Sequence, residues 1–81
     1  MVNVKFFGTA RVKFQTRSLD VDADDVKTLI EKIAKHFGIN EKDLKQFLVY
    51  VNEKNITELK MYKTKLADGD TVMFLSPASG G

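Results

Sequence analysis

The segment TVMFL at residues 71–75 runs directly into SPASGG at residues 76–81. A short apolar run with β-branched and aromatic residues is typical of a strand with at least one buried face. Pro77 then stops the strand, because proline has a fixed φ and no N–H to donate to a neighbouring strand. The closing segment therefore predicts a strand that ends abruptly a few residues before Gly81.

The residues after Pro77 have almost no side chain to bury, so nothing in the sequence ties them to a folded body. We expect a single folded domain over residues 1–76, followed by a flexible C-terminal tail over residues 77–81. Gly80 and Gly81 would let this tail adopt almost any backbone conformation and enter a channel too narrow for a Cβ atom. The tail would end in the α-carboxylate of Gly81, which would be its reactive group.

The composition excludes several classes of protein. The 81 residues include no Cys and one His, which excludes disulfides, thiol chemistry and the usual zinc spacings, so we expect no metal site. No run approaches the ~20 apolar residues of a membrane span, and the N-terminus lacks a signal-peptide pattern. The 13 basic and 11 acidic side chains are largely interspersed and indicate a solvated surface. We therefore expect a cytoplasmic protein that binds neither nucleic acid nor a membrane.

Two N-terminal stretches show the period-two alternation of strands with one buried face. Val2, Val4 and Phe6 form the first stretch, and a short connection at residues 8–11 would lead into a second strand over residues 11–21. A bulge near residues 15–18 would interrupt this second strand.

The main helix is the clearest element. Its apolar residues follow the i, i+3, i+4, i+7 spacing of a single buried stripe, which predicts a helix over about residues 23–37. Asp22 is the expected N-cap and Gly38 the expected stop. His36 lies in the last turn, where a cation is favoured, so we interpret it as a helix-terminal residue without a chemical role. The stripe comprises Val26, Leu29, Ile30, Ile33, Ala34 and Phe37.

The second half of the chain predicts three more extended segments. These segments are a strand over residues 48–51, a short edge strand containing Ile56 and Leu59, and the final strand over residues 71–75. A short helical turn would fall within residues 40–47, an irregular stretch at residues 61–65, and a tight turn around Gly69 within residues 66–70.

This order of elements predicts an α+β protein with the β-grasp (ubiquitin-like) fold. A mixed sheet of four to five strands would pack on the one main helix at about residues 23–37. The first and last strands would be the central pair and would run parallel, with the helix across them.

Strand alternation also predicts which side chains point away from the core. If Val72 and Phe74 point inward, their neighbours point outward. The expected exposed apolar patch beside the tail comprises Phe7, Tyr50, Met73 and Leu75, and together with Pro77 these are the candidate partner-binding residues. Such patches usually mark a partner site. The alternative is that a loop such as residues 61–65 covers some of them.

The remaining polar residues have simpler interpretations. Asp68 and Asp70 are expected to form the turn around Gly69 and not an acid–base pair. Arg11 and the lysines at 54, 60, 63 and 65 fit a solvated surface, although an acidic partner would also fit them. Because no residue offers an activated nucleophile, an oriented base or a metal, we expect a non-catalytic protein.

Three segments together resemble a known family. They are KFF at residues 5–7, VYVN at residues 49–52, and above all the closing pattern of residues 66–81, which reads L-x-D-G-D-x-V, an apolar run, a proline and a terminal diglycine. This pattern resembles the small subunits of molybdopterin synthase (MoaD-like proteins), within the MoaD/ThiS superfamily of ubiquitin-like sulfur carriers. Ser76, where the family often has a second proline, and the short connection at residues 8–11 depart from its pattern.

The resemblance implies a function for the C-terminus. An E1-like enzyme would use ATP to adenylate Gly81, which would become a thiocarboxylate and donate its sulfur in molybdenum cofactor synthesis. The large subunit of molybdopterin synthase would be the second partner, in a heterotetramer, and this chain would bind no cofactor itself. The alternatives are a ubiquitin-like modifier joined through Gly81 to lysines, a sulfur carrier for thiamine or another pathway, and a passive interaction domain.

Overall fold

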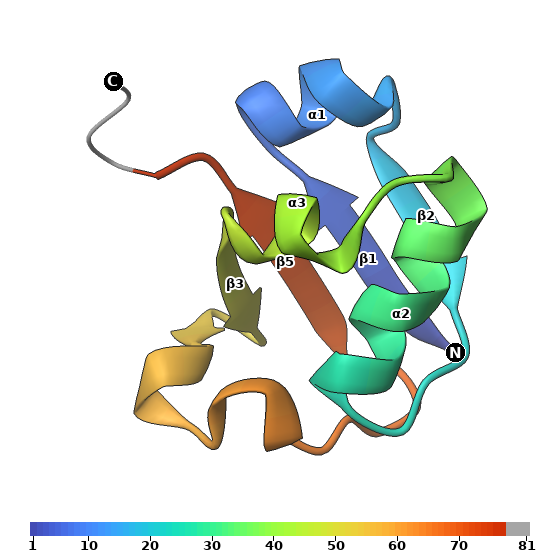
Figure 1. Cartoon of the computed structure of the whole chain (residues 1–81). Helices are drawn as coiled ribbons and strands as arrows, with labels where there is room; N and C mark the ends of the chain where they lie inside the picture. Colours follow the sequence, from blue (N-terminus) through green and yellow to red (C-terminus); the bar gives the residue numbers. More distant parts are fainter. Residues whose placement is uncertain (78–81) are drawn as a thin grey trace.

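The computed structural model describes residues 1–77, in which a five-stranded mixed sheet carries its longest helix across one face (Figure 1). This arrangement confirms the predicted α+β, β-grasp fold. The strands are β1 (Val2–Phe6), β2 (Ser18–Val21), β3 (Leu48–Val51), β4 (Lys54–Asn55) and β5 (Thr71–Leu75). The helices are α1 (Thr9–Phe14), α2 (Val26–Phe37) and α3 (Glu41–Lys45), with short 3₁₀ turns η1 (Ile56–Glu58) and η2 (Met61–Lys63).

The first and last strands form the centre of the sheet. The strand order is β2-β1-β5-β3-β4, and β1 and β5 run parallel with Val4 opposite Val72 and Phe6 opposite Phe74. β2 pairs antiparallel with β1, and β3 pairs antiparallel with β5. The predicted central parallel pair is therefore confirmed.

The core lies between this sheet and α2. Inward side chains of the central strands, such as Phe6 and Phe74, are at most 1% exposed, and so are Leu29, Ile30 and Ile33 of α2. An aromatic cluster continues this core toward α1: the ring of Phe6 lies 5.2 Å from that of Phe14 and 5.7 Å from that of Phe74 between centroids. Phe14 also stacks on Phe37 at 4.9 Å.

The start of α2 differs from the prediction, because the N-cap is Asp25 and not Asp22. The Asp25 carboxylate accepts a hydrogen bond from the Thr28 N–H at 2.8 Å, and this hydrogen bond is the main cause that lowers the pKa of Asp25. The helix begins late because the residues before it pair with the segment around Lys65: Asp24 O accepts from the Leu66 N–H, and the Val26 N–H donates to Thr64 O. The end at Gly38, with φ 68°, agrees with the prediction.

The predicted second strand over residues 11–21 is wrong in its first half. Residues 9–14 form α1, and only Ser18–Val21 are extended, as β2. The helix buries Ala10 and Phe14, which are spaced i and i+4, while Val12 is 76% exposed. The alternation of Val12 and Phe14 thus imitated a strand, although only Phe14 belongs to the core.

The predicted edge strand at Ile56 and Leu59 is also wrong. The edge strand is β4 at Lys54–Asn55, and Ile56 begins the 3₁₀ turn η1. The Asn55 side chain accepts from the Thr57 N–H at 3.0 Å, which starts the turn one residue after the strand. Ile56 is buried all the same, so it contributes to the core from a turn and not from a strand.

Removal of the Phe14 ring should destabilise the protein far more than truncation of its neighbour on α1. Phe14→Ala creates a cavity against three other rings and is expected to cost about 3 kcal/mol or more of unfolding free energy. Val12→Ala, on the exposed side of the same helix, should change it by less than about 0.5 kcal/mol. Urea denaturation followed by circular dichroism measures both, and equal losses would contradict the placement of α1.

Candidate functional site

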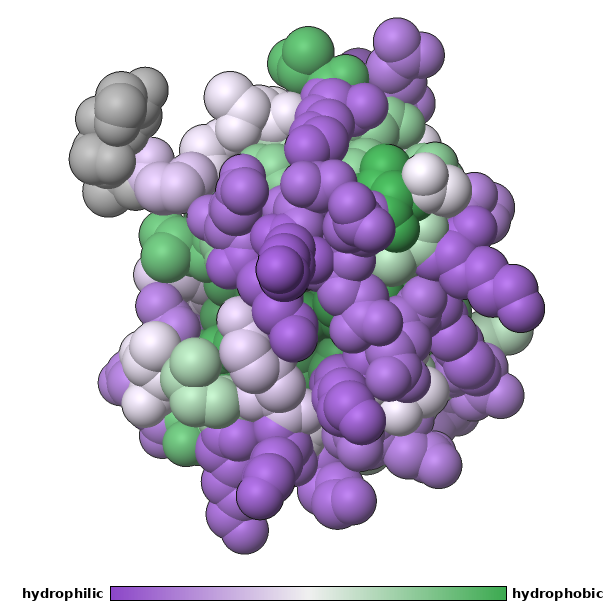
Figure 2. Space-filling model, viewed as in Figure 1, coloured by the Kyte–Doolittle hydropathy of each residue, from purple (hydrophilic) through white to green (hydrophobic). Residues whose placement is uncertain are grey.

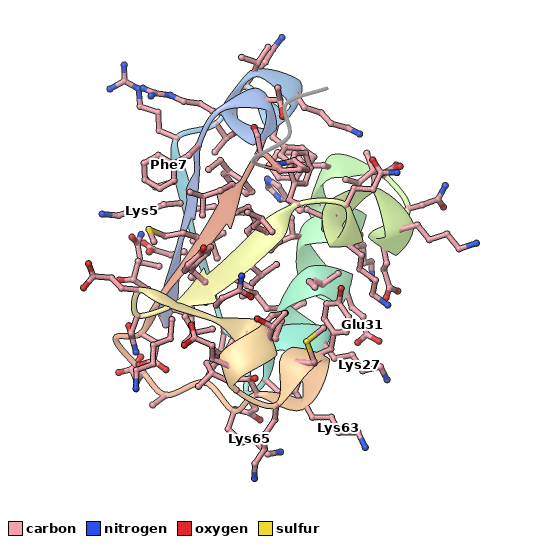
Figure 3. All side chains as sticks on the ribbon, turned by 90° about the vertical axis from the view of Figure 1, so that its left-hand side faces the viewer. Lys5, Phe7, Lys27, Glu31, Lys63 and Lys65 are labelled. Atoms are coloured by element: carbon pink, nitrogen blue, oxygen red, sulfur yellow. The ribbon has the colours of Figure 1, made fainter. Side chains whose placement is uncertain are left out.

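The sheet has one face covered by α2 and one face open. Figure 3 shows Lys5 and Phe7 pointing away from α2, on the open side of the sheet. Figure 2 views the molecule from the α2 side, where the surface is mainly hydrophilic. Because strand residues alternate between faces, the open face receives every second side chain of β1, β5 and β3.

The strand register gathers apolar side chains on this open face. Tyr50 of β3 lies opposite Met73 of β5, and Leu48 lies opposite Leu75. Side chains directly opposite each other on one face lie about 5 Å apart at Cβ, within contact distance. Phe7 follows β1, donates its N–H to Phe74 O at 2.9 Å and is 40% exposed.

We call these five residues the open-face patch: Phe7, Leu48, Tyr50, Met73 and Leu75. Phe7 is exposed and the other four residues are partly exposed, so none of the five is buried. The outward orientation expected for Phe7, Tyr50, Met73 and Leu75 is therefore confirmed, and Leu48 joins them through its pairing with Leu75. That a partner protein binds them stays a prediction.

A basic rim lies beside Phe7. A hollow of about 290 Å³ is lined by Lys5, Phe6, Phe7, Arg11, Arg17 and Ser18. Its lining holds three cations and no acid, so it would attract an acidic group next to the patch. Arg11, which the sequence also offered as a contact for an acidic partner, reaches this hollow from α1 and not from the predicted strand.

The chain leaves the sheet next to the patch. β5 ends at Leu75, Ser76 follows it beside the start of α1, and Pro77 is exposed. Pro77, the fifth predicted partner-binding residue, is the last residue that the structure describes. Gly80 and Gly81, and with them most of the predicted tail, lie outside the described residues, so their predicted roles remain predictions.

The two acidic residues of the turn before β5 are occupied by structural contacts. Asp70 accepts from the Ala67 N–H at 2.8 Å and from Asn52 Nδ2 at 3.0 Å, and these bonds, in that order, lower its pKa. Asp68 pairs with the N-terminal amine of Met1. Gly69 has φ 91°, as the predicted tight turn requires.

Asn52 joins the turn to the open-face strands. Its Oδ1 accepts from the Thr71 N–H at 3.0 Å, at the first residue of β5, while its Nδ2 donates to Asp70. The amide thus spans the ends of β3 and β5 and fixes the register that brings Tyr50 opposite Met73. Its backbone has φ 49°, a conformation that Asn tolerates better than most residues.

Two further observations concern the described part of the chain alone. Residues 1–77 contain no group of three or more His, Cys, Asp or Glu side chains that could hold a metal ion. None of their helices has the length and apolar character needed to span a bilayer.

Comparisons with known proteins identify similar sequences and folds. The model of the ThiS family matches residues 4–81 of the chain. Curated protein sequences gave no match. In the crystal structure of the BexX/CysO complex of Amycolatopsis orientalis, one chain is 20% identical with a TM-score of 0.84, and the match covers 100% of this chain and 100% of that chain.

Two other solved structures are similar over nearly their whole length. The small archaeal modifier protein 1 of Methanosarcina acetivorans is 23% identical with a TM-score of 0.83, and the match covers 99% of this chain and 95% of that chain. In a complex of subunits 1 and 2 of the molybdopterin-converting factor from Helicobacter pylori 26695, one chain is 26% identical with a TM-score of 0.67 and coverage of 99% and 97%. The archaeal modifier is 23% identical and the Amycolatopsis chain 20% identical, so these two similarities show the fold alone.

The pKa of Asp70 makes a prediction about acid stability. Because the hydrogen bonds from Ala67 and Asn52 hold the pKa of Asp70 in the folded state below the ordinary aspartate value of 3.8, the ionised Asp70 stabilises the fold above that pH, and this contribution is lost as the pH falls through the folded-state pKa. The difference in unfolding free energy between wild type and Asp70→Asn should therefore narrow in acid.

Urea unfolding at a series of pH values from about 7 to about 2 measures this difference. The same comparison in an Asn52→Ala background should give a smaller difference, since one donor to the carboxylate is gone. A difference that stays constant with pH would contradict the assignment.

Proposed function

The chain belongs to the ThiS family, within the superfamily of ubiquitin-like sulfur carriers, and we propose that its specific role is that of the small subunit of a molybdopterin synthase. In this role Gly81 carries sulfur and the folded body carries Gly81 to two partners in turn. The first partner is an E1-like adenylating enzyme that uses ATP, and the second is the large subunit of the synthase, with which the chain would form a heterotetramer.

The proposed chemistry takes place at the C-terminal carboxylate. A carboxylate is a poor electrophile, so one oxygen of Gly81 first attacks the α-phosphorus of ATP, and pyrophosphate leaves. Hydrosulfide, or a donor equivalent to it, then attacks the acyl carbon, and AMP leaves with the former carboxylate oxygen. The product is a thiocarboxylate, whose sulfur is later passed to the acceptor. Each step needs groups that the partner enzymes supply, so in this proposal the chain is not an enzyme.

One observation carries the proposal: the exit of the chain lies beside the open-face patch. β5 contributes Met73 and Leu75 to the patch and continues directly into Ser76 and Pro77. A partner that binds the patch therefore holds the body close to the point from which the C-terminal residues extend. The basic rim adds an electrostatic requirement, so the fitting partner surface is apolar with acidic groups at one edge.

Molybdopterin synthesis is the favoured pathway for two reasons. The closing sequence, from Leu66 through the DGD turn to Pro77 and the diglycine, resembles that of the small synthase subunits. In addition, the similar chain from Helicobacter pylori occurs in a complex of the two molybdopterin-converting factor subunits. The BexX/CysO complex is a second case in which a similar chain occurs in a complex with another protein. Carriage of sulfur in another pathway is the alternative that membership of the sulfur-carrier superfamily leaves.

A protein modifier is the second candidate function. It is suggested by the fold that the chain shares with small archaeal modifier protein 1 together with the C-terminal diglycine of this sequence. In a modifier, the same adenylated Gly81 would become joined to a lysine amine of a target protein. In a sulfur carrier, it would instead pass sulfur to an acceptor. Mass spectrometry of lysine-linked adducts in cells distinguishes the two.

Incubation with ATP, a sulfide source and an activating enzyme from the same organism should convert the C-terminus to a thiocarboxylate. We expect the intact mass to rise by the difference between sulfur and oxygen, because one oxygen of Gly81 is replaced. A chain that lacks Gly81 should show no shift, although it keeps the whole described body.

The negative result has a defined meaning. If the same assay converts a control carrier and leaves this chain unchanged with every activating enzyme of the organism, the sulfur-carrier proposal fails. A passive interaction domain would then be favoured, and deletion of Gly80 and Gly81 would leave its binding unchanged.

The open-face patch should control how tightly the activating enzyme binds. Met73→Asp places a charge within the patch, opposite Tyr50, and is expected to raise the KM for the chain by about tenfold or more, since a few apolar and aromatic residues carry most of the binding energy of an interface. Leu59→Asp is the matched control, because Leu59 is 36% exposed but lies outside the patch. Pyrophosphate release at varied concentrations of the chain measures both KM values, and equal effects would exclude the patch as the docking surface.

A further inference from the structure

The hydroxyl of Ser76 lies against the start of α1 at the point where the chain leaves the sheet. The Thr9 N–H donates to Ser76 Oγ at 2.6 Å, and Thr9 Oγ1 lies 2.7 Å from the same oxygen. Since Ser76 Oγ accepts the backbone N–H, its own hydrogen is available for Thr9 Oγ1. One hydroxyl thus makes two short hydrogen bonds to a residue 67 positions earlier in the chain.

The parallel pairing of β1 and β5 brings these residues together. Phe6 lies opposite Phe74, so the two strands end at the same edge of the sheet and their next residues emerge side by side. Gly8 allows the contact in two ways. Its φ of +61° and ψ of −134° suit glycine alone, and a Cβ at this position would overlap the Ser76 hydroxyl.

Pro77 restricts the path of the chain at the residue after Ser76. Its ring fixes its own φ and disfavours the helical conformation for the residue before it, which is Ser76. The Ser76 hydroxyl therefore fixes where the chain departs, and Pro77 restricts the direction in which it continues. Neither residue packs in the core, since Ser76 is partly exposed and Pro77 is exposed.

We propose that Ser76 is a positioning residue for the C-terminal carboxylate. The contact between Ser76 and Thr9, which we call the exit latch, sets the point and direction of chain departure, so that Gly81 is presented to the adenylating site of a partner docked on the open-face patch. This inference rests on the function proposed above. In this role Ser76 takes no direct part in the reaction and acts only through the path of the chain.

The latch and the patch should affect different kinetic constants. Docking of the body on the patch determines the KM, whereas placement of Gly81 follows docking and determines the fraction of complexes that react. When that fraction is small, its further reduction lowers kcat and leaves KM unchanged. A loss of kcat at constant KM is therefore the signature of the latch, and a rise in KM is the signature of the patch.

Pyrophosphate release by the activating enzyme at varied chain concentration is the test. Ser76→Ala removes both hydrogen bonds and should lower kcat about three- to tenfold, the range that one or two net hydrogen bonds supply, with KM unchanged. Thr9→Val removes one of the two bonds and should give a smaller loss of the same kind. Thr9→Ser keeps the hydroxyl and should restore kcat, and Thr57→Val, an exposed threonine remote from the exit, should behave as wild type.

The double variant Ser76→Ala/Thr9→Val tests whether the two residues act as one unit. If the latch is the only route of their effect, the double variant should be no slower than Ser76→Ala alone. Hydrogen exchange of the Thr9 amide provides a readout that needs no enzyme: Ser76→Ala should accelerate it, because the amide loses its acceptor.

Each outcome decides the proposal. Unchanged kcat in Ser76→Ala, or a rise in KM in place of a fall in kcat, overturns the positioning role. If no activating enzyme acts on the wild type while a control carrier reacts, the sulfur-carrier function fails and the positioning role fails with it. In that case Thr9 exchange still reports whether the contact exists, so the two failures are distinguishable.

Discussion

The parallel hydrogen bonding between β1 and β5 is the constraint on which the rest of the structure depends. It joins the first strand to the last, so the helix and the remaining strands form within the loop that this pairing closes. It places Phe6 and Phe74 together under α2, which seeds the aromatic core. It also aligns the carboxyl ends of both strands at one edge, where the start of α1 and the exit of the chain then meet.

The two faces of the sheet divide stability from recognition. The face under α2 holds the largest buried side chains, and the charged surface of α2 covers it from solvent (Figure 2). The open face has partly exposed apolar residues in register across β5 and β3, with cations beside them. Because strand side chains alternate, the same few residues of β5 serve both faces: Val72 and Phe74 in the core, Met73 and Leu75 outside.

The sequence was sufficient where periodicity and burial agree. α2 was predicted because its apolar residues form one inward stripe. β3 and β5 were predicted because they are short apolar runs bounded by turn residues, and the orientation of the open-face patch followed from the alternation of buried and outward residues along them. Prediction failed at α1, where exposed Val12 imitated a strand, and at Asp22, because backbone pairing with Thr64 and Leu66 delays the helix to Asp25. The contact of Thr9 with Ser76 could not be predicted, since it depends on the register of strands that are distant in sequence.

The opposite placement of the two strand ends has a mechanical consequence. Val2 begins β1 at one end of the central strand pair, and Leu75 ends β5 at the opposite end. A force that pulls the two ends of the chain apart would act along these strands in opposite directions. Their hydrogen bonds would then bear the load in shear, all together, instead of opening one after another from one end. A cellular unfoldase that grips the C-terminus would meet this ladder as its first barrier, and it would have to break the centre of the fold before any edge strand peels away.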